Sequence, residues 1–211
     1  MTRDVADDAL LRRLRHALHP LDALPMGEGA NAPLMREWFG INAFREAAVL
    51  IGLVPRVDGW KVLLTLRTDR LRHHGGQVAF PGGARDPGDA DAIGTALRET
   101  REELDISAAL IHPLGALDPM ATVSGFRVTP IVARLDSDYI AKPNPREVAD
   151  AFEVSLDALC DPANLGQVEM KMGHGIRHVL EYRLPQSLSP HRIWGASAMM
   201  LDDLRQRLEP A

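Results

Sequence analysis

The sequence predicts an α/β fold in which helices pack on a mixed β-sheet. Segments with helical and strand periodicity alternate irregularly along the chain, without the regular βαβ repetition of a doubly wound fold. Short apolar runs at residues 47–54 and 60–67 are separated by turn residues, which is typical of two antiparallel neighbours. We therefore expect a mixed sheet with helices packed on it.

The chain before the first strand, residues 1–43, is expected to form a lead-in with helical and irregular parts. Residues 5–18 carry apolar side chains at helical spacing, and a His-Pro pair ends that helix. Residues 20–43 are rich in Pro, Gly and Asn, which indicates irregular structure. The lead-in and the rest of the chain are expected to form a single domain over residues 1–211.

The elements after the second strand follow from apolar spacing and from helix-breaking residues. A helix is expected to begin at an N-cap, either Asp89 or Asp91, and to run to about Leu104. In the strand expected at residues 127–134, Pro130 indicates an edge position or a bulge. Two further strands, a hairpin and a C-terminal helix are expected at residues 110–117, 147–154, 168–184 and 195–208.

Composition is typical of a soluble globular protein and argues against several functions. Of the 211 residues, 45% are hydrophobic and 25% are charged, so the chain can bury a sizeable core. A net charge of −5 argues against a general nucleic-acid-binding protein, which needs a basic surface. The single cysteine, Cys160, rules out an internal disulfide and fits a cytoplasmic location. No apolar run reaches membrane-spanning length.

Three carboxylates gather on the expected helix, at Glu99, Glu102 and Glu103. Successive helical residues turn by about 100°, so these side chains fall within roughly a 100° arc of one face. An adjoining apolar stripe would bury one side of the helix and present the acidic patch beside it. Adjacent carboxylates repel one another unless a cation lies among them. The plain alternative is an acidic face that is merely solvated.

Carboxylate oxygens are hard ligands that suit Mg²⁺ or Mn²⁺. Such an ion commonly shares phosphate oxygens with a substrate and turns a bound water into a nucleophile. Gly82 and Gly83 precede the helix, and backbone without side chains can come close to an anion or a metal. Arg98 can hold the cluster through bidentate bonds. The stretch from Gly82 to Glu103 therefore predicts a metal site.

The segment that starts at Gly83 resembles the Nudix box, G-x5-E-x7-R-E-U-x-E-E-x-G-U, in which U is an aliphatic residue. Its core is present as R-E-T-R-E-E, beginning at Arg98. Asp89 stands where the pattern has Glu, and eight residues instead of seven separate it from Arg98. Thr100 replaces the first aliphatic residue, and Asp105 replaces the second glycine.

A second resemblance lies upstream and points to the coenzyme A pyrophosphatase branch of the same family. Residues 63–83 are similar to the branch pattern, L-L-T-x-R-S-x3-R-x3-G-x3-F-P-G-G, with Thr68 in place of Ser. Its two arginines, Arg67 and Arg72, lie on the strand end and loop that lead into the box, where they could bind a phosphate or could simply be surface residues. The positions expected to bind the substrate are Arg67, Arg72, Gly76, Phe80 and Gly82.

The two resemblances imply a Nudix fold, which is an α/β/α sandwich with a mixed β-sheet and a loop-helix-loop. They imply a hydrolase that depends on Mg²⁺ or Mn²⁺ and cuts coenzyme A into adenosine 3′,5′-bisphosphate and 4′-phosphopantetheine. The expected catalytic residues are Glu99, Glu102, Glu103, Arg98 and Glu147. The three clustered glutamates and the carbonyl of Gly83 are the implied metal ligands. For Glu147 we weigh a general base, a further ligand and a solvated acid.

Two rival functions stay open at this point. A Nudix enzyme could instead act on ADP-ribose, NADH or a dinucleotide, because loops outside the box set specificity. A catalytically silent Nudix-like binding domain is disfavoured, because all three glutamates are present. The expected partner is a small-molecule substrate, with no nucleic acid and no membrane, and the sequence leaves a homodimer open.

Overall fold

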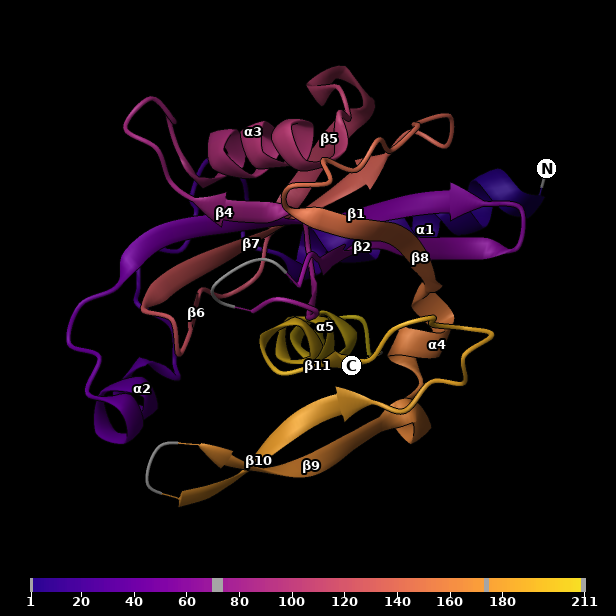
Figure 1. Cartoon of the computed structure of the whole chain (residues 1–211). Coiled ribbons are helices and arrows are strands. Elements are labelled where there is room, and N and C mark those ends of the chain that lie inside the picture. Colours follow the sequence, from indigo (N-terminus) through magenta and orange to yellow (C-terminus); the bar gives the residue numbers. More distant parts are fainter. Residues whose placement is uncertain (1, 70–73, 173–174, 210–211) are drawn as a thin grey trace.

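The main feature of the computed structural model, which describes residues 2–69, 74–172 and 175–209, is a twisted sheet. Within these residues the sheet has eight strands, and β3, β2, β1, β7 and β5 form its central row (Figure 1). Those five strands span, in the same order, Val78–Ala79, Gly59–Arg67, Arg45–Arg56, Phe126–Leu135 and Ile111–Ala116. The other three each pair with one member of the row: β4 (Gly82–Ala84) with β1, β6 (Met120–Ala121) with β7 and β8 (Val148–Ser155) with β2.

Strand direction makes this a mixed sheet, as the sequence predicted. β1 and β7 run parallel, whereas the other pairings of the sheet are antiparallel. β1 is buried on both faces over most of its length, which explains its nearly unbroken apolar run. The antiparallel β1–β2 pair is the one that the apolar runs predicted.

Helices cover both faces of the sheet, so the fold is an α/β/α sandwich (Figure 1). α3, Ala92–Leu104, lies on one face, where it packs on buried side chains such as Leu50. α5, Ala196–Arg207, lies on the other face and packs in a second core that includes Ile51. The pleat of β1 sends Leu50 and Ile51 to opposite sides, so one strand contributes to both cores.

The segment before β1 contains two helices, α1 (Thr2–Ala17) and α2 (Ala32–Phe39). The expectation that residues 20–43 are irregular was therefore wrong over α2. Pro33 lies in the first turn of α2, where its missing N–H costs nothing. Gly40 ends the helix in the left-handed conformation and donates its N–H to the carbonyl of Arg36.

A smaller sheet and a short helix follow the main sheet in the chain. The sheet consists of β9, β10 and β11, and the helix is α4; they span Leu165–Met172, Gly175–Tyr182, Ile193–Trp194 and Leu156–Cys160. Single 3₁₀ turns occur at Ala108–Leu110 and Pro162–Asn164. In the part of the chain that the structure describes, no helix has the length and apolar character needed to cross a membrane.

Pro130 lies in the centre of the sheet, so the expected edge position was wrong. Its strand, β7, has β1 on one side and β5 on the other. The carbonyl of Pro130 accepts a hydrogen bond from the N–H of Leu117, just beyond the end of β5. Because N–H and C=O of one strand residue point to the same side, the missing N–H faces the point where β5 has ended.

Candidate active site

Helix α3 is built to present one acidic face beside the sheet. Asp91 caps it, since its side chain accepts a 2.8 Å hydrogen bond from the N–H of Gly94. Ala96 and Leu104 are fully buried against the sheet and fix the rotation of the helix. The sequence therefore located this helix and one of its two suggested caps correctly.

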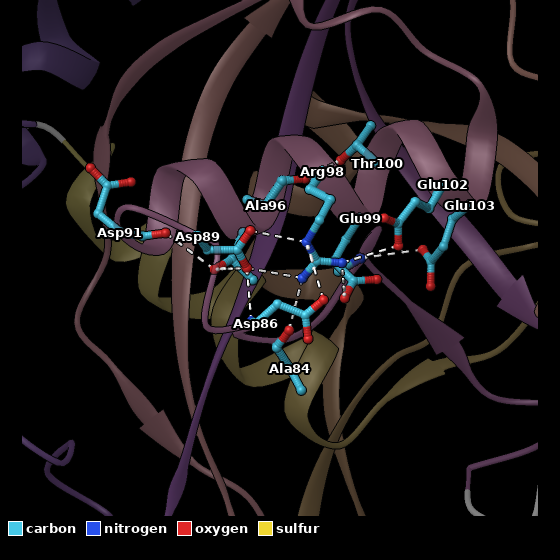
Figure 2. A network of polar contacts seen from close by, with 12 residues as sticks. Ala84, Asp86, Asp89, Asp91, Ala96, Arg98, Glu99, Thr100, Glu102 and Glu103 are labelled. Atoms are coloured by element: carbon cyan, nitrogen blue, oxygen red, sulfur yellow. Dashed lines mark hydrogen bonds and ion pairs between the residues drawn. The ribbon is translucent and has the colours of Figure 1, made fainter.

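The three glutamates of α3 differ sharply in exposure, although they share one face (Figure 2). The side chain of Glu103 is 3% exposed, that of Glu99 is 14% exposed and that of Glu102 is 57% exposed. An acidic face that was merely solvated would leave all three carboxylates in water. Burial of two of them argues for a site that needs their charge.

The glycine pair on β4 makes room for these carboxylates. The N–H of Gly82 donates a 3.3 Å hydrogen bond to Oε2 of Glu103. A Cβ on Gly83 would lie 2.5 Å from Oε1 of Glu99, so no larger residue fits there without moving that carboxylate. Gly82 has φ +156° and a Cβ there would meet the carbonyl oxygen of Ala48. The close approach predicted for the glycines is thus an approach to the glutamates.

Arg98 is the centre of a polar network that joins the helix to the loop before it (Figure 2). Its five N–H bonds are all used: Nε and Nη2 donate to Asp89, Nη2 also to the carbonyl of Ala84, and Nη1 to Glu99 and Glu102, each at 3.0 Å. A guanidinium without a free donor has nothing left to offer a substrate. In this arrangement Arg98 orients Glu99 and Glu102.

Asp89 connects that network to the loop before α3. Its carboxylate, 7% exposed, also accepts hydrogen bonds from the N–H of Asp86 and the hydroxyl of Thr95, both at 2.9 Å. The bonds from Arg98, above all, hold the pKa of Asp89 well below its usual range, and the bonds from Asp86 and Thr95 add to this. Asp89 therefore stays ionised and ties the loop at residues 86–91 to α3.

Arg67, at the end of β2, faces the buried Glu103. Its Nη1 lies 3.9 Å from Oε1 of Glu103, and its buried Nε has no hydrogen-bond partner among the described residues. Burial raises the pKa of Glu103 to about 8, with Glu99 and Glu147 adding to the rise and Arg67 opposing it. Burial likewise raises the pKa of Glu99. Burial outweighs the nearby arginines at both carboxylates, and a divalent cation would favour their ionised forms.

The carboxylate oxygens of this site are of the type that a hard divalent cation prefers. The side chains, however, do not yet converge on a single metal position. Among the residues that the structure describes, no three His, Cys, Asp or Glu side chains are gathered in a metal-site arrangement. Glu99 and Glu102 are both turned to Nη1 of Arg98 instead. A metal would therefore compete with Arg98 for these two carboxylates.

Glu147 reaches the site on a loop that is anchored to α3. The N–H groups of Lys142 and Asn144 donate to the carbonyls of Leu104 and Glu103, at 2.7 and 2.8 Å. Thr68, just beyond the end of β2, donates its N–H to the carbonyl of Glu147 at 2.9 Å. Because the Glu147 carboxylate contributes to the raised pKa values of Glu99 and Glu103, it lies within electrostatic reach of both.

The other residues expected to contact substrate have different surroundings. Phe80 is 3% exposed and belongs to the core on the α5 side, so its ring has little surface to offer a ligand. Gly76 has φ +70° and donates its N–H to the carbonyl of Arg67, which closes the base of the preceding loop. Arg72 lies outside the described residues.

Comparison with known proteins decides the family. The NUDIX domain model matches residues 44–174, more than half of the chain. The chain belongs to the Nudix hydrolase family. It is 41% identical over 170 residues to a protein of Yersinia enterocolitica named "Uncharacterized Nudix hydrolase NudL", covering 81% of this chain and 84% of that one. A protein of the same name from Yersinia pestis is 40% identical over 165 residues, with coverage of 78% and 80%.

A solved structure supports the Nudix fold. The NUDIX domain of Shewanella oneidensis NrtR, solved with ADP-ribose, matches with a TM-score of 0.51 and 15% identity, over 81% of this chain and 92% of that one. At this identity the likeness concerns the fold alone. The family assignment makes the chain a hydrolase that acts on pyrophosphate bonds, a class of enzyme that generally uses divalent metal ions.

The three residues that depart from the Nudix box each make a defined contact or adopt a defined backbone conformation. Asp89 makes a bidentate pair with Arg98 across the longer loop. Asp105 ends α3 with φ 55° and ψ 28°, a left-handed conformation that glycine adopts more readily. Thr100 is buried and satisfies its hydroxyl by donating to the carbonyl of Ala96 at 2.7 Å.

Sequence reasoning missed two contributors to this Nudix site. The carbonyl of Ala84 accepts from Arg98, which no side-chain pattern could reveal. Asn144 accepts the N–H groups of Glu147 and Val148 with its carbonyl and that of Arg146 with its side chain. Its position between two prolines, in P-N-P, was the signal for a tight turn that holds Glu147.

Proposed function

We propose that this Nudix hydrolase cleaves the pyrophosphate bond of coenzyme A, releasing adenosine 3′,5′-bisphosphate and 4′-phosphopantetheine. The observation that carries the proposal is Arg67, whose partly exposed side chain lies 3.9 Å from Glu103 of the glutamate cluster. Arg67 belongs to the segment at residues 63–83 that is similar to the coenzyme A pyrophosphatase branch. A partly exposed arginine at this place is suited to a phosphate oxygen.

Mg²⁺ or Mn²⁺ is the metal that this donor set suits. Glu99 and Glu103 would hold it, with Glu102 and the carbonyl of Gly83 as additional ligands. When bound, the ion offsets charge on the phosphate oxygens and lowers the pKa of a water molecule. Its positive charge would also favour the ionised form of Glu103, whose pKa is otherwise raised to about 8.

The side chains around the metal position divide the remaining work. Arg67 orients one phosphate through the exposed part of its side chain. Glu147, held by the loop at residues 142–147, accepts a proton from the attacking water or serves as a further ligand. Arg98 keeps Glu99 and Glu102 in place. Every donor of Arg98 is bound to a protein acceptor, so we assign Arg98 the role of positioning the two glutamates. Phosphate binding is left to Arg67 and to Arg72, which lies outside the described residues.

The main alternative is a Nudix hydrolase of ADP-ribose, NADH or a dinucleotide. The NUDIX domain of NrtR, which shares the fold, was solved with ADP-ribose. Retention of all three glutamates and of Arg67 beside them argues against a catalytically silent domain. We place the enzyme in the cytoplasm, in keeping with its single cysteine.

A substrate panel in ¹⁸O-water tests the proposal. Coenzyme A, ADP-ribose, NADH and a dinucleotide are compared by kcat/KM with Mg²⁺ and then with Mn²⁺. We expect coenzyme A to be preferred, with ¹⁸O in one of the two products, which identifies the phosphorus that is attacked. Faster hydrolysis of ADP-ribose would replace the proposed substrate. Absence of metal-dependent turnover on every substrate would favour the silent domain.

A further inference from the structure

Arg45 has an unusual position at the start of β1, close to the glycine pair. It pairs with Phe126 of the parallel strand β7, and its guanidinium lies over the Phe126 ring, 4.3 Å from the ring centre. Two residues further, Ala47 belongs to the core on the α5 side. Because alternate strand residues share a face, Arg45 lies on the sheet face opposite α3.

The charge of Arg45 is not neutralised within the described part of the chain. No carboxylate there forms an ion pair or hydrogen bond with its guanidinium, although the neighbouring Glu46 is acidic. Glu46 is instead bound to Arg85 at 2.5 Å, on the α3 side. Arg36 provides the contrast: it lies over the ring of Phe44 but is paired with Glu28 at 2.5 Å. A guanidinium that stacks on a ring and keeps free donors is a typical phosphate-binding group.

Arg45 lies at the same end of β1 as the pairing with β4. Ala48 pairs with Gly83, which contacts Glu99, so Arg45 is about 10 Å along β1 from that point. β4 pairs only with β1 among the described strands, so its outer edge is free of another strand. In Figure 1 the start of β1 extends beyond the end of α5. A substrate that extends from the glutamates to Arg45 must pass round this edge to the second face.

Half-buried apolar side chains continue that second face beside Arg45. Val49, Met120 and Phe126 pack against the core but keep part of their surface exposed. Such a surface next to an unpaired guanidinium suits a nucleoside that carries an additional phosphate.

We propose that Arg45, held on Phe126, binds the phosphate monoester at the nucleotide end of the substrate. This inference rests on the proposed function. For coenzyme A the group is the 3′-phosphate, which dephospho-coenzyme A and ADP-ribose lack. Arg45 would thereby determine specificity without touching the bond that is cut.

Paired substrates test Arg45 directly. For Arg45→Ala we expect kcat/KM on coenzyme A to fall about tenfold, mostly through KM, while dephospho-coenzyme A is hydrolysed within about twofold of the wild-type rate. Arg36→Ala, which removes a stacked but acid-paired arginine, should leave the ratio between the two substrates unchanged. Phe126→Leu should also lower the ratio of kcat/KM on coenzyme A to kcat/KM on dephospho-coenzyme A, by a smaller factor than Arg45→Ala does.

Product binding provides a second readout that does not depend on turnover. By calorimetry, Arg45→Ala should weaken the binding of adenosine 3′,5′-bisphosphate and leave the binding of AMP unchanged. Equal losses on both substrates, or no loss on coenzyme A, would overturn the inference while leaving the proposed function intact. If wild-type protein does not hydrolyse coenzyme A at all, the proposed function fails first, and the binding measurement then decides separately whether Arg45 binds the bisphosphate.

Discussion

At the scale of single residues, the site depends on close contacts that leave little tolerance for change. Arg98 uses every donor, Gly83 has no space for a methyl group, and Glu103 is buried. Sequence patterns identified these residues because each carries distinctive chemistry. They could not show that Asp89, which departs from the Nudix box, makes the bidentate contact with Arg98, since that depends on the path of the loop.

Gly83→Ala tests the close approach of the backbone to Glu99. The new Cβ would lie 2.5 Å from the Glu99 carboxylate, which must then move away from its place. We expect kcat to fall by about a hundredfold, as small misplacements in active sites do, while the thermal unfolding temperature changes little. Gly88→Ala is the matched control, because nothing lies within 4 Å of a Cβ there. Full activity in Gly83→Ala would contradict this account.

Asp89→Asn tests the anchoring of the loop. The variant loses the charge that pairs with Arg98, and we expect the free energy of unfolding to fall by about 1–3 kcal/mol. Metal affinity should fall as well, since Arg98 can then turn toward Glu99 and Glu102. Asp86→Asn is the control, because its exposed carboxylate lies 3.9 Å from Arg98. Chemical denaturation and metal titration measure both effects, and equal results for the two variants would argue against the anchoring role.

The raised pKa of Glu103 predicts that metal binding depends on pH. Without metal, the carboxyl is mainly protonated below about pH 8, whereas a metal ligand must be ionised. The apparent affinity for Mg²⁺ should therefore increase as pH rises toward 8 and then level off, with proton release on binding below that pH. Calorimetry in buffers of different ionisation enthalpy measures these protons. An affinity that is flat between pH 6 and 8 would contradict the raised pKa.

At the scale of elements, apolar periodicity predicted α3, β1 and β2 well because each buries a regular set of side chains. It failed for α2, which is short and lies in a segment rich in Pro and Gly. It also misplaced Pro130, because a missing N–H is harmless in a central strand where the neighbouring strand has ended. Local patterns cannot reveal where a neighbour ends.

Asp105→Gly tests the end of α3. The left-handed conformation of Asp105 is strained for a residue with a Cβ, so glycine should raise the free energy of unfolding by about 0.5–1 kcal/mol. The variant also loses the ion pair with Lys142 at 2.9 Å, but an exposed ion pair contributes little to the free energy of unfolding. Lys142→Ala is the control that measures the ion pair alone. Destabilisation by Asp105→Gly beyond that of Lys142→Ala would show that the aspartate itself stabilises the helix end.

At the scale of the whole molecule, the site is assembled from segments that are far apart in sequence. α3, β4, the end of β2 and the loop at residues 142–147 meet there because β4 pairs with β1 and the loop is bonded to the end of α3. The sequence predicted that the glutamates of α3 and the glycine pair of β4 belong to one site. It left Glu147 open, because only the folded chain shows that the loop that carries Glu147 is bonded to the end of α3.

Metal-dependent cleavage of coenzyme A at the glutamate cluster is tested by comparing coenzyme A hydrolysis by the wild-type protein and by Glu103→Gln. Glutamine resembles the protonated form that the buried site already favours without metal, so the fold should survive, as thermal unfolding can verify. We predict metal-dependent turnover by the wild type and a loss of about a thousandfold or more in the variant, because the ligand charge is gone. Turnover of coenzyme A by a folded Glu103→Gln variant at a rate near that of the wild type would contradict the account.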